Sequence, residues 1–221
     1  MLLAMDTATP AVTVALHDGD PASPALAASH QVDARRHGEL LLPAVDRVLA
    51  EAGRGLGELT GVVVGVGPGP YTGLRVGLVT AEVLGMTLGI PVYGLCTLDG
   101  IAYATGGDIE GPFVVATDAR RKEVYWARYA DARTRVTEPA VDRPADLAGQ
   151  VAGLPAAGAG AELYPEVFPD ARPPVHPPAA ALAALAAERL AAGAGLLPPR
   201  PLYLRRPDAQ VPAAYKAVTP R

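Results

Sequence analysis

Residues 65–85, GVGPGPYTGLRVGLVTAEVLG, constrain the fold more than any other stretch of this 221-residue chain. Gly73, Gly77, Ala81 and Gly85 recur every four residues, so on a helix they form one continuous stripe of small residues. Each interior glycine destabilises a helix by about 1 kcal/mol relative to alanine. A helix that keeps three of them on one stripe therefore needs the close approach of another backbone. The remaining positions are apolar almost all round, which predicts burial on more than one side.

A phosphate-binding loop also contains several glycines around a turn, but the spacing of the glycines here disfavours that interpretation. A Walker loop ends in Gly-Lys-Ser/Thr, and the stretch has no lysine at that place. Gly67, Gly69 and Gly73 miss the Gly-x-Gly-x-x-Gly spacing of dinucleotide-binding loops by one position. Pro68 and Pro70 also remove two backbone N–H donors from the turn.

A second amphipathic helix is predicted over residues 38–52, and it offers one explanation for the stripe. This helix could cover the stripe within the same chain, and that alternative stays open. The other hypothesis is that helices 38–52 and 72–88 both present apolar faces to another polypeptide. Under that hypothesis Gly77→Leu leaves the isolated fold largely intact and abolishes pairing. Unfolding of the variant would instead place the stripe inside the chain.

The order of predicted elements indicates a mixed sheet. Three strand-like runs come first, followed by helix 38–52, a β-branched run at 61–67 and helix 72–88. The pattern β-β-β-α-β-α-β-α is typical of an α/β ribonuclease H-like, or actin-like ATPase, fold with mixed sheets flanked by helices. After residue 105 the chain starts again with a strand, a turn and a strand. We expect an N-terminal subdomain at 1–105, a smaller C-terminal subdomain at 106–205 whose last helix (179–192) packs back, and a polar tail at 206–221.

Asp6, Thr7, Ala8 and Thr9 follow the first strand, where actin-like ATPases carry an Asp-x-Gly phosphate turn. Threonine and alanine stand where a permissive glycine is needed, so this backbone is poorly suited to approach a phosphate. The Asp6 side chain is expected to accept hydrogen bonds from the amides of its own turn. We therefore predict a degenerate phosphate turn and no cofactor.

The sequence contains no pattern typical of a metal site or of a catalytic nucleophile. The four histidines, His17, His30, His37 and His176, form neither H-x-x-x-H nor HExxH. The single cysteine, Cys96, excludes an internal disulfide and is expected to be a small core residue. We predict no metal site and no catalytic constellation.

Charge and termini bound the possible partners. Nineteen Lys and Arg residues stand against 23 Asp and Glu residues, a net charge of −4, whereas a nucleic-acid binder acting alone usually has a basic surplus. Asp118, Arg120, Arg121 and Glu123 are expected to form a solvated hairpin turn, with contact to a partner or RNA as the alternative. No signal sequence and no bilayer-spanning apolar run is evident, so a cytoplasmic location is expected.

Six stretches follow one another in the order found in one protein family. Together they resemble the TsaB family, a bacterial subunit of the tRNA threonylcarbamoyladenosine machinery, and GPG-x-[FY]-TGLR is the most specific part. Two departures are Pro70, where the family usually has Ser, and Asp99, where Glu is common. The stretches are MDTAT…VTVAL (5–16), HGELLLPAVDRVL (37–49), GVGPGPYTGLRVGL (65–78), PVYGLCTLDGIA (91–102), DARRKEVYWA (118–127) and PLYLR (201–205).

The resemblance implies an actin-like fold with a degenerate nucleotide site in a subunit that is not itself the transferase. It implies pairing with the larger paralogue TsaD, which holds the metal and the threonylcarbamoyl-adenylate, with the ATPase TsaE joining the complex. Contact with tRNA is then made only through the complex, and a homodimer through the same surface is possible without TsaD.

The alternatives from other classes are an active actin-like ATPase or small-molecule kinase and, disfavoured by the absence of ligand histidines, a metallopeptidase. The resemblance places the partner interface on the two N-terminal helices. The residues expected there are His37, Glu39, Leu41, Leu42, Val45 and Leu49 on the first helix, and Tyr71, Thr72, Gly73, Leu74, Arg75, Gly77, Leu78 and Ala81 on the second.

Overall fold

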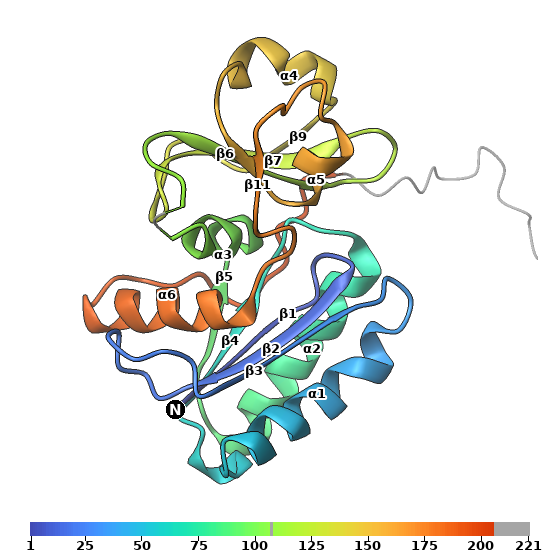
Figure 1. Ribbon diagram of the computed structural model, residues 1–221. Coiled ribbons are helices and arrows are strands. Elements are labelled where there is room, and N and C mark those ends of the chain that lie inside the picture. Colours follow the sequence, from blue (N-terminus) through green and yellow to red (C-terminus); the bar gives the residue numbers. More distant parts are fainter. Residues whose placement is uncertain (107, 206–221) are drawn as a thin grey trace, which may run out of the picture.

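The first sheet lies between two layers of helix (Figure 1), and alternate side chains of its strands belong to different apolar clusters. Leu3 and Met5 pack in one apolar cluster, whereas Leu2 and Ala4 pack in another on the opposite face. The first three strands are antiparallel, and the last two run parallel to β1. Across the sheet the order is β3 (Ala27–Val32), β2 (Ala11–His17), β1 (Leu2–Asp6), β4 (Gly61–Gly65) and β5 (Val92–Leu95).

Helices cover both faces of this sheet (Figure 1). On one face lie α1 (His37–Glu51), which packs on β2, and α2 (Tyr71–Leu88), which packs on β4. On the other face α6 (Ala179–Ala191) packs on β1 and β2, and it also contacts α3 (Thr97–Ala104). The last helix of the chain thus returns to the first sheet. A single 3₁₀ turn, η1 (Leu56–Glu58), leads from α1 into β4.

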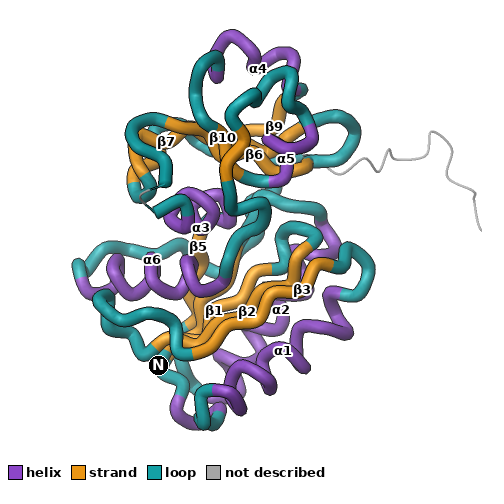
Figure 2. The backbone as a smooth tube through the Cα atoms, viewed as in Figure 1, coloured by secondary structure: helices purple, strands orange, loops and turns teal. Residues whose placement is uncertain are grey.

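A second, smaller mixed sheet follows (Figure 2). Strands β6 and β7 form an antiparallel hairpin at its centre, and β10 lies parallel to β6. Two short helices, α4 (Pro144–Val151) and α5 (Ala159–Leu163), belong to this half. The order is β11 (Ala171–Arg172), β10 (Ala156–Ala157), β6 (Phe113–Asp118), β7 (Val124–Asp131) and β8 (Thr134–Arg135), with β9 (Ala140–Asp142) also paired to β7.

Helix α3 joins the two halves through apolar and polar contacts. Its Leu98 and Ile101 belong to the same buried cluster as Phe113 and Val115 of the second sheet, together with the fully buried Cys96 at its N-terminus. Burial raises the pKa of the Cys96 thiol to about 12, so this residue behaves as the small core residue expected from the sequence.

One carboxylate on α3 binds donors from the second sheet and from α6. Asp99 Oδ1 accepts hydrogen bonds from Tyr129 Oη at 2.9 Å and from an Arg135 guanidinium nitrogen at 2.7 Å. Asp99 Oδ2 accepts a longer bond of 3.4 Å from Arg189. Because Asp99 is buried, loss of either cation would leave a poorly solvated charge between the two halves.

The strand order 3-2-1-4-5, with β1 to β3 antiparallel and β4 and β5 parallel to β1, confirms the ribonuclease H-like, actin-like fold class predicted from the sequence. Residues 153–178 contain β10, α5 and β11, which were not among the elements predicted from the sequence. Elements of two to five residues are too short to show periodicity. The computed structural model describes residues 1–106 and 108–205, and the predicted tail at 206–221 lies outside them.

The small-residue stripe of α2 faces the interior of its own chain. A Cβ atom at Gly73 would lie 2.7 Å from the Thr7 carbonyl oxygen, and one at Gly77 would lie 2.6 Å from Thr7 Oγ1. A Cβ atom at Gly85 would overlap Val92 of β5. The expectation that this stripe contacts another polypeptide is therefore wrong. The backbone that approaches it is the β1–β2 turn of the same subunit.

These contacts reverse the expectation for Gly77→Leu. We predict that this substitution lowers the free energy of unfolding by more than about 3 kcal/mol, because a leucine cannot fit against the Thr7 hydroxyl. Urea unfolding followed by circular dichroism measures the change. The matched control is Gly149→Ala in α4, where a Cβ meets no atom within 4 Å, and it should leave stability unchanged or raise it by up to about 1 kcal/mol. A stable, cooperatively folding Gly77→Leu variant would contradict this assignment.

Candidate functional site

The turn after β1 is held together by the buried carboxylate of Asp6. Its Oδ1 accepts a hydrogen bond from the Ala8 backbone amide at 2.8 Å, and its Oδ2 accepts one from Thr97 Oγ1 at 2.7 Å. Thr97 Oγ1 in turn accepts a hydrogen bond from the Gly67 amide at 3.1 Å. The side chain of Asp6 occupies the space that a Cβ on Gly65 would fill. The expectation that Asp6 satisfies amides of its own turn is confirmed.

The two threonines of this turn attach it to the helices. Thr7 Oγ1 donates a hydrogen bond to the Gly73 carbonyl at 2.7 Å and accepts one from the Gly77 amide at 2.9 Å. These are the two groups that pair with each other in an ordinary α-helix, so the hydroxyl bridges one step of the ladder. At the start of α1, His37 Nε2 donates to the Thr9 carbonyl at 2.8 Å.

The turn is covered by its own chain where a phosphate would have to bind. Gly69 packs so closely on the turn that a Cβ there would overlap the Ala8 carbonyl. Residues 67–70 therefore form a lid of backbone over residues 6–9. The turn at residues 6–9 has no glycine, whereas the lid at residues 67–70 has Gly67 and Gly69. Because glycine has no side chain, the backbone of the lid can approach the backbone of the turn closely.

Burial raises the pKa of the Asp6 carboxyl to about 6, and the hydrogen bonds from Thr97 and from the Ala8 amide oppose part of that rise. The carboxyl is fully enclosed and no cation is among the causes of its shift. Asp6 thus behaves as a structural carboxyl that is partly protonated near pH 6. Its role is to connect β1, the lid and the start of α3.

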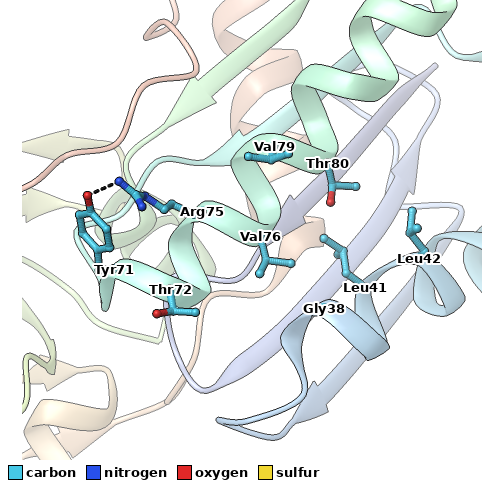
Figure 3. A pocket seen from close by; sticks show the side chains of 9 residues that line it. All are labelled: Gly38, Leu41, Leu42, Tyr71, Thr72, Arg75, Val76, Val79 and Thr80. Carbon is cyan, nitrogen blue, oxygen red and sulfur yellow. Dashed lines mark hydrogen bonds between the residues drawn. The ribbon is translucent and has the colours of Figure 1, made fainter. Parts of the chain in front are cut away.

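A groove of about 490 Å³ lies between α1 and α2. Its lining is largely apolar, and the contributing side chains come from both helices (Figure 3). Leu42 on α1 is 53% exposed and Val79 on α2 is 57% exposed, which is high for aliphatic side chains that lie beside one another. The lining residues are Gly38, Leu41, Leu42, Tyr71, Thr72, Arg75, Val76, Val79 and Thr80.

The apolar surface continues along α2 beyond the groove. Val83 is 54% exposed and Met86 is 84% exposed, so with Val79 they form an apolar row one helical turn apart. This row lies on the side of α2 opposite to the glycine stripe. We call Leu42, Tyr71, Val79, Val83 and Met86 the apolar α1–α2 face.

The expected interface residues divide into two groups. The side chains or backbones of the first group pack within the subunit's own core, which disfavours direct contact with a partner, and their interface role stays a prediction. The second group is exposed and lies in or beside the groove, where its role as an interface stays a prediction. The first group is His37, Leu41, Val45, Leu49, Gly73, Leu74, Gly77, Leu78 and Ala81, although the edge of Leu41 lines the groove; the second is Glu39, Leu42, Tyr71, Thr72 and Arg75.

Val79, Val83 and Met86 were not among the interface residues predicted from the sequence. All three belong to the apolar positions that made α2 look buried on more than one side. Their spacing of four and three residues is visible in the sequence, but the glycine stripe was predicted to face outward in their place.

An aromatic and cationic cluster closes the groove at the N-terminal end of α2. The rings of Tyr71 and Tyr203 stack with centroids 4.8 Å apart, and the Arg75 guanidinium lies 3.6 Å from the Tyr71 centroid. Arg75 Nε also donates to Tyr203 Oη at 3.0 Å, and the same side chain donates to Tyr71 Oη. The cluster connects the groove to the segment that follows α6.

The described residues offer neither a metal-binding cluster nor a membrane-spanning helix. Among residues 1–106 and 108–205, no group of three or more His, Cys, Asp or Glu side chains is arranged to hold a metal ion. Within the same residues, no helix is both long and apolar enough to traverse a bilayer.

Comparison with known proteins identifies the family. A family model described as TsaD, tRNA N6-adenosine threonylcarbamoyltransferase, matches residues 30–171, which is more than half of the chain. The chain is 33% identical over 130 residues to the Escherichia coli tRNA threonylcarbamoyladenosine biosynthesis protein TsaB, covering 58% of this chain and 54% of that protein. The structure of YeaZ from Pseudomonas aeruginosa matches with a TM-score of 0.77 at 31% identity, covering 92% of this chain and 99% of that chain.

The chain belongs to the TsaB family. A protein of Mycobacterium tuberculosis is more similar in sequence, at 47% identity over 149 residues, which is 66% of each chain. The aligned region thus spans just under two thirds of that relative and just over half of the E. coli TsaB. The groove, the exposed apolar row and the enclosed turn are features of this TsaB-family chain.

The raised pKa of Asp6 predicts a pH dependence of stability. Between about pH 4 and pH 6 the folded chain holds a proton that the unfolded chain has released, so the free energy of unfolding falls as pH rises through this window. Relative to the wild type, Asp6→Asn should therefore gain about 2–3 kcal/mol between pH 4 and pH 7. Urea titrations at several pH values measure this difference.

The control is Asp18→Asn, because the Asp18 carboxylate is exposed and the Asp20 amide lowers its pKa. Its stabilising contribution is lost as pH falls, so that variant should lose stability relative to the wild type as pH rises. A pH-independent difference for Asp6→Asn would contradict the burial of an uncompensated carboxyl at this position.

Proposed function

We propose that this chain is a non-catalytic subunit of the complex that forms N6-threonylcarbamoyladenosine at adenosine 37 of tRNA. In this proposal it pairs with the catalytic subunit TsaD and stabilises its active form, and the ATPase TsaE joins the pair. Its relatives carry the name of a tRNA threonylcarbamoyladenosine biosynthesis protein, and the matching family model carries the name of the transferase. The complex acts in the cytoplasm, where its tRNA substrates are.

The observation that carries the pairing is the apolar α1–α2 face. Val79, Val83 and Met86 of α2 are each more than half exposed, and they adjoin the apolar groove between α1 and α2. Contiguous apolar surface of this kind marks a protein interaction site, because its burial removes apolar area from water. Helices of a partner fit such a surface, with the groove receiving a ridge of side chains.

The same face supports a homodimer when the catalytic subunit is absent. A two-fold axis brings one surface patch against its own copy, so an apolar patch is compatible with itself without any charge matching. Exposed charges within the face are few, with Arg75 already engaged by Tyr71 and Tyr203. Homodimer and heterodimer would then compete for one surface.

The enclosed turn supports a non-catalytic role. In an active ATPase or kinase of this fold the turn after the first strand must admit a phosphate group, and here the Gly69 backbone packs on it. Asp6 is committed to Thr97 and the Ala8 amide rather than to solvent. The alternative of an active ATPase or small-molecule kinase therefore has no specific observation in its favour.

We predict that threonylcarbamoylation of tRNA by TsaD and the other components requires this chain. Val79→Glu should weaken pairing with TsaD by at least about 2 kcal/mol, or about 30-fold, because it places a charge in the apolar face. Product formation from labelled threonine measures activity, and sedimentation velocity measures pairing.

The matched control is Leu163→Glu at the end of α5, which is 54% exposed and lies in the other half of the chain. Both variants should keep the thermal stability of the wild type, since neither side chain is buried. Normal pairing by Val79→Glu, or equal loss in both variants, would remove the α1–α2 face as the interface. Full activity of TsaD without the chain would refute the proposed function.

We also predict that the isolated chain neither binds ATP tightly nor hydrolyses it. Calorimetric titration with Mg·ATP should show no heat of binding in the micromolar range, since the lid of residues 67–70 covers the turn. Micromolar binding with turnover would favour the ATPase or kinase alternative instead.

A further inference from the structure

The hairpin turn between β6 and β7 has an unusual backbone. Arg120, Arg121 and Lys122 all have left-handed conformations, with φ values of 61°, 56° and 61°. Residues with side chains adopt this region rarely, and long side chains do so less readily than glycine or asparagine. Three in succession are maintained only where the surroundings, or a function, require these residues.

The shape of the turn does not need cationic side chains. Backbone bonds close it, from the Ala119 amide to the Glu123 carbonyl at 3.0 Å and from the Glu123 amide to the Arg120 carbonyl at 3.1 Å. Asp118 Oδ1 accepts the Arg120 amide at 2.7 Å. Glycine or asparagine at these three positions would make the same backbone bonds with less strain. Arginine and lysine at these three positions therefore make the turn less stable than glycine or asparagine would.

These cations lie next to the end of the α1–α2 groove. The Arg205 guanidinium donates to the Arg120 carbonyl at 3.3 Å and pairs with Glu123. Two residues earlier, Tyr203 stacks on Tyr71, which lines the groove. We call Arg120, Arg121, Lys122 and Arg205 the basic tip. The basic tip is thus linked to the end of the groove through residues 203–205.

The basic tip has more positive than negative charge in a chain whose net charge is negative. Among the described residues, the tip combines four cations with the carboxylates of Asp118 and Glu123, which pair with Arg120 and Arg205, whereas the whole chain has a net charge of −4. The Arg120 side chain is 57% exposed although it pairs with Asp118 at 3.2 Å, and Lys122 is also exposed. Local basic charge on an acidic protein marks a binding surface for an anion rather than a solubilising surface.

We propose that the basic tip binds the phosphate backbone of the substrate tRNA when the chain is paired with the catalytic subunit. This inference rests on the proposed function, which brings RNA to the complex. Arginine and lysine contacts to phosphates supply affinity without reading sequence. The net charge of −4 makes such binding weak for the chain alone, so the contact acts only beside a partner that holds the same RNA.

Phosphate is favoured over an acidic protein surface for two reasons. Lysine is depleted in protein–protein interfaces, whereas it is a principal ligand of nucleic-acid backbones. The tip also projects from a tight turn of the second sheet, outside the apolar face that a protein partner would bury. A short projecting turn contacts a rounded RNA backbone without requiring a flat complementary surface.

The test uses the reconstituted complex with TsaD and measures tRNA binding across a range of salt concentrations. Lys122→Gly should lower RNA affinity about fivefold at 0.15 M salt and reduce the slope of log affinity against log salt by about one. The same variant should melt at a higher temperature than the wild type, because glycine relieves the left-handed strain. A purely structural role for Lys122 predicts no change in the salt slope.

Two further variants complete the experiment. Lys122→Glu should lower RNA affinity further while pairing with TsaD, measured without RNA, stays unchanged. Arg172→Gln on β11 removes an exposed cation of the same half that pairs with Asp170, and it should leave the salt slope unchanged.

The outcomes are distinct. An unchanged salt slope in both Lys122 variants overturns the inference, and so does a loss of pairing with TsaD, which would assign the tip to an acidic protein surface. A loss of ATP binding by the complex with an unchanged RNA slope also overturns it. If the wild-type chain does not pair with TsaD, the proposed function fails, and the inference fails with it.

Discussion

The structure depends on one hydroxyl group. Thr7 Oγ1 bridges the carbonyl of Gly73 and the amide of Gly77, and it thereby fixes α2 against the turn that follows β1. A side chain at Gly77 would collide with this hydroxyl and one at Gly73 with the Thr7 carbonyl, so the two glycines and the threonine are required together. Because this contact sets the rotation of α2 about its axis, it also decides which residues face outward. Val79 and Val83 are exposed because Gly73 and Gly77 are not.

The same contact helps to enclose the turn that follows β1. A phosphate turn must leave its backbone open to an anion, whereas here Thr7 bonds to α2 and the Gly69 backbone lies on Ala8. Asp6 is enclosed beneath them with a raised pKa, which suits a structural carboxyl and not a ligand of a solvated cation. The turn thus holds α2, the helix that presents the apolar face, in a fixed position. The enclosure of the turn and the exposure of the apolar α1–α2 face therefore follow from one set of contacts.

Much of the fold could be predicted from the sequence, because long elements show their period. The helices that contain Leu41 and Leu74 and the strand that contains Val63 were located correctly by apolar spacing alone. The site was predicted less well, since a stripe of glycines shows that some backbone must approach but does not say which. The answer lies at Thr7, far from Gly77 in sequence, and no local pattern connects them. The left-handed backbone of the basic tip is equally invisible, because residues with long side chains give no indication of positive φ.

The segment after α6 connects the apolar α1–α2 face to the basic tip. It pairs with the edge of the first sheet, where the Gly94 amide donates to the Leu197 carbonyl at 2.7 Å, and the Leu202 amide then donates to the Val66 carbonyl at 2.8 Å. From there Tyr203 reaches α2. The segment at residues 197–205 thus contacts β5, α2 and the β6–β7 turn in succession. Under the two proposals, a phosphate backbone at the basic tip and a partner on α2 would both lie against this one segment, whose backbone is already hydrogen-bonded to the first sheet.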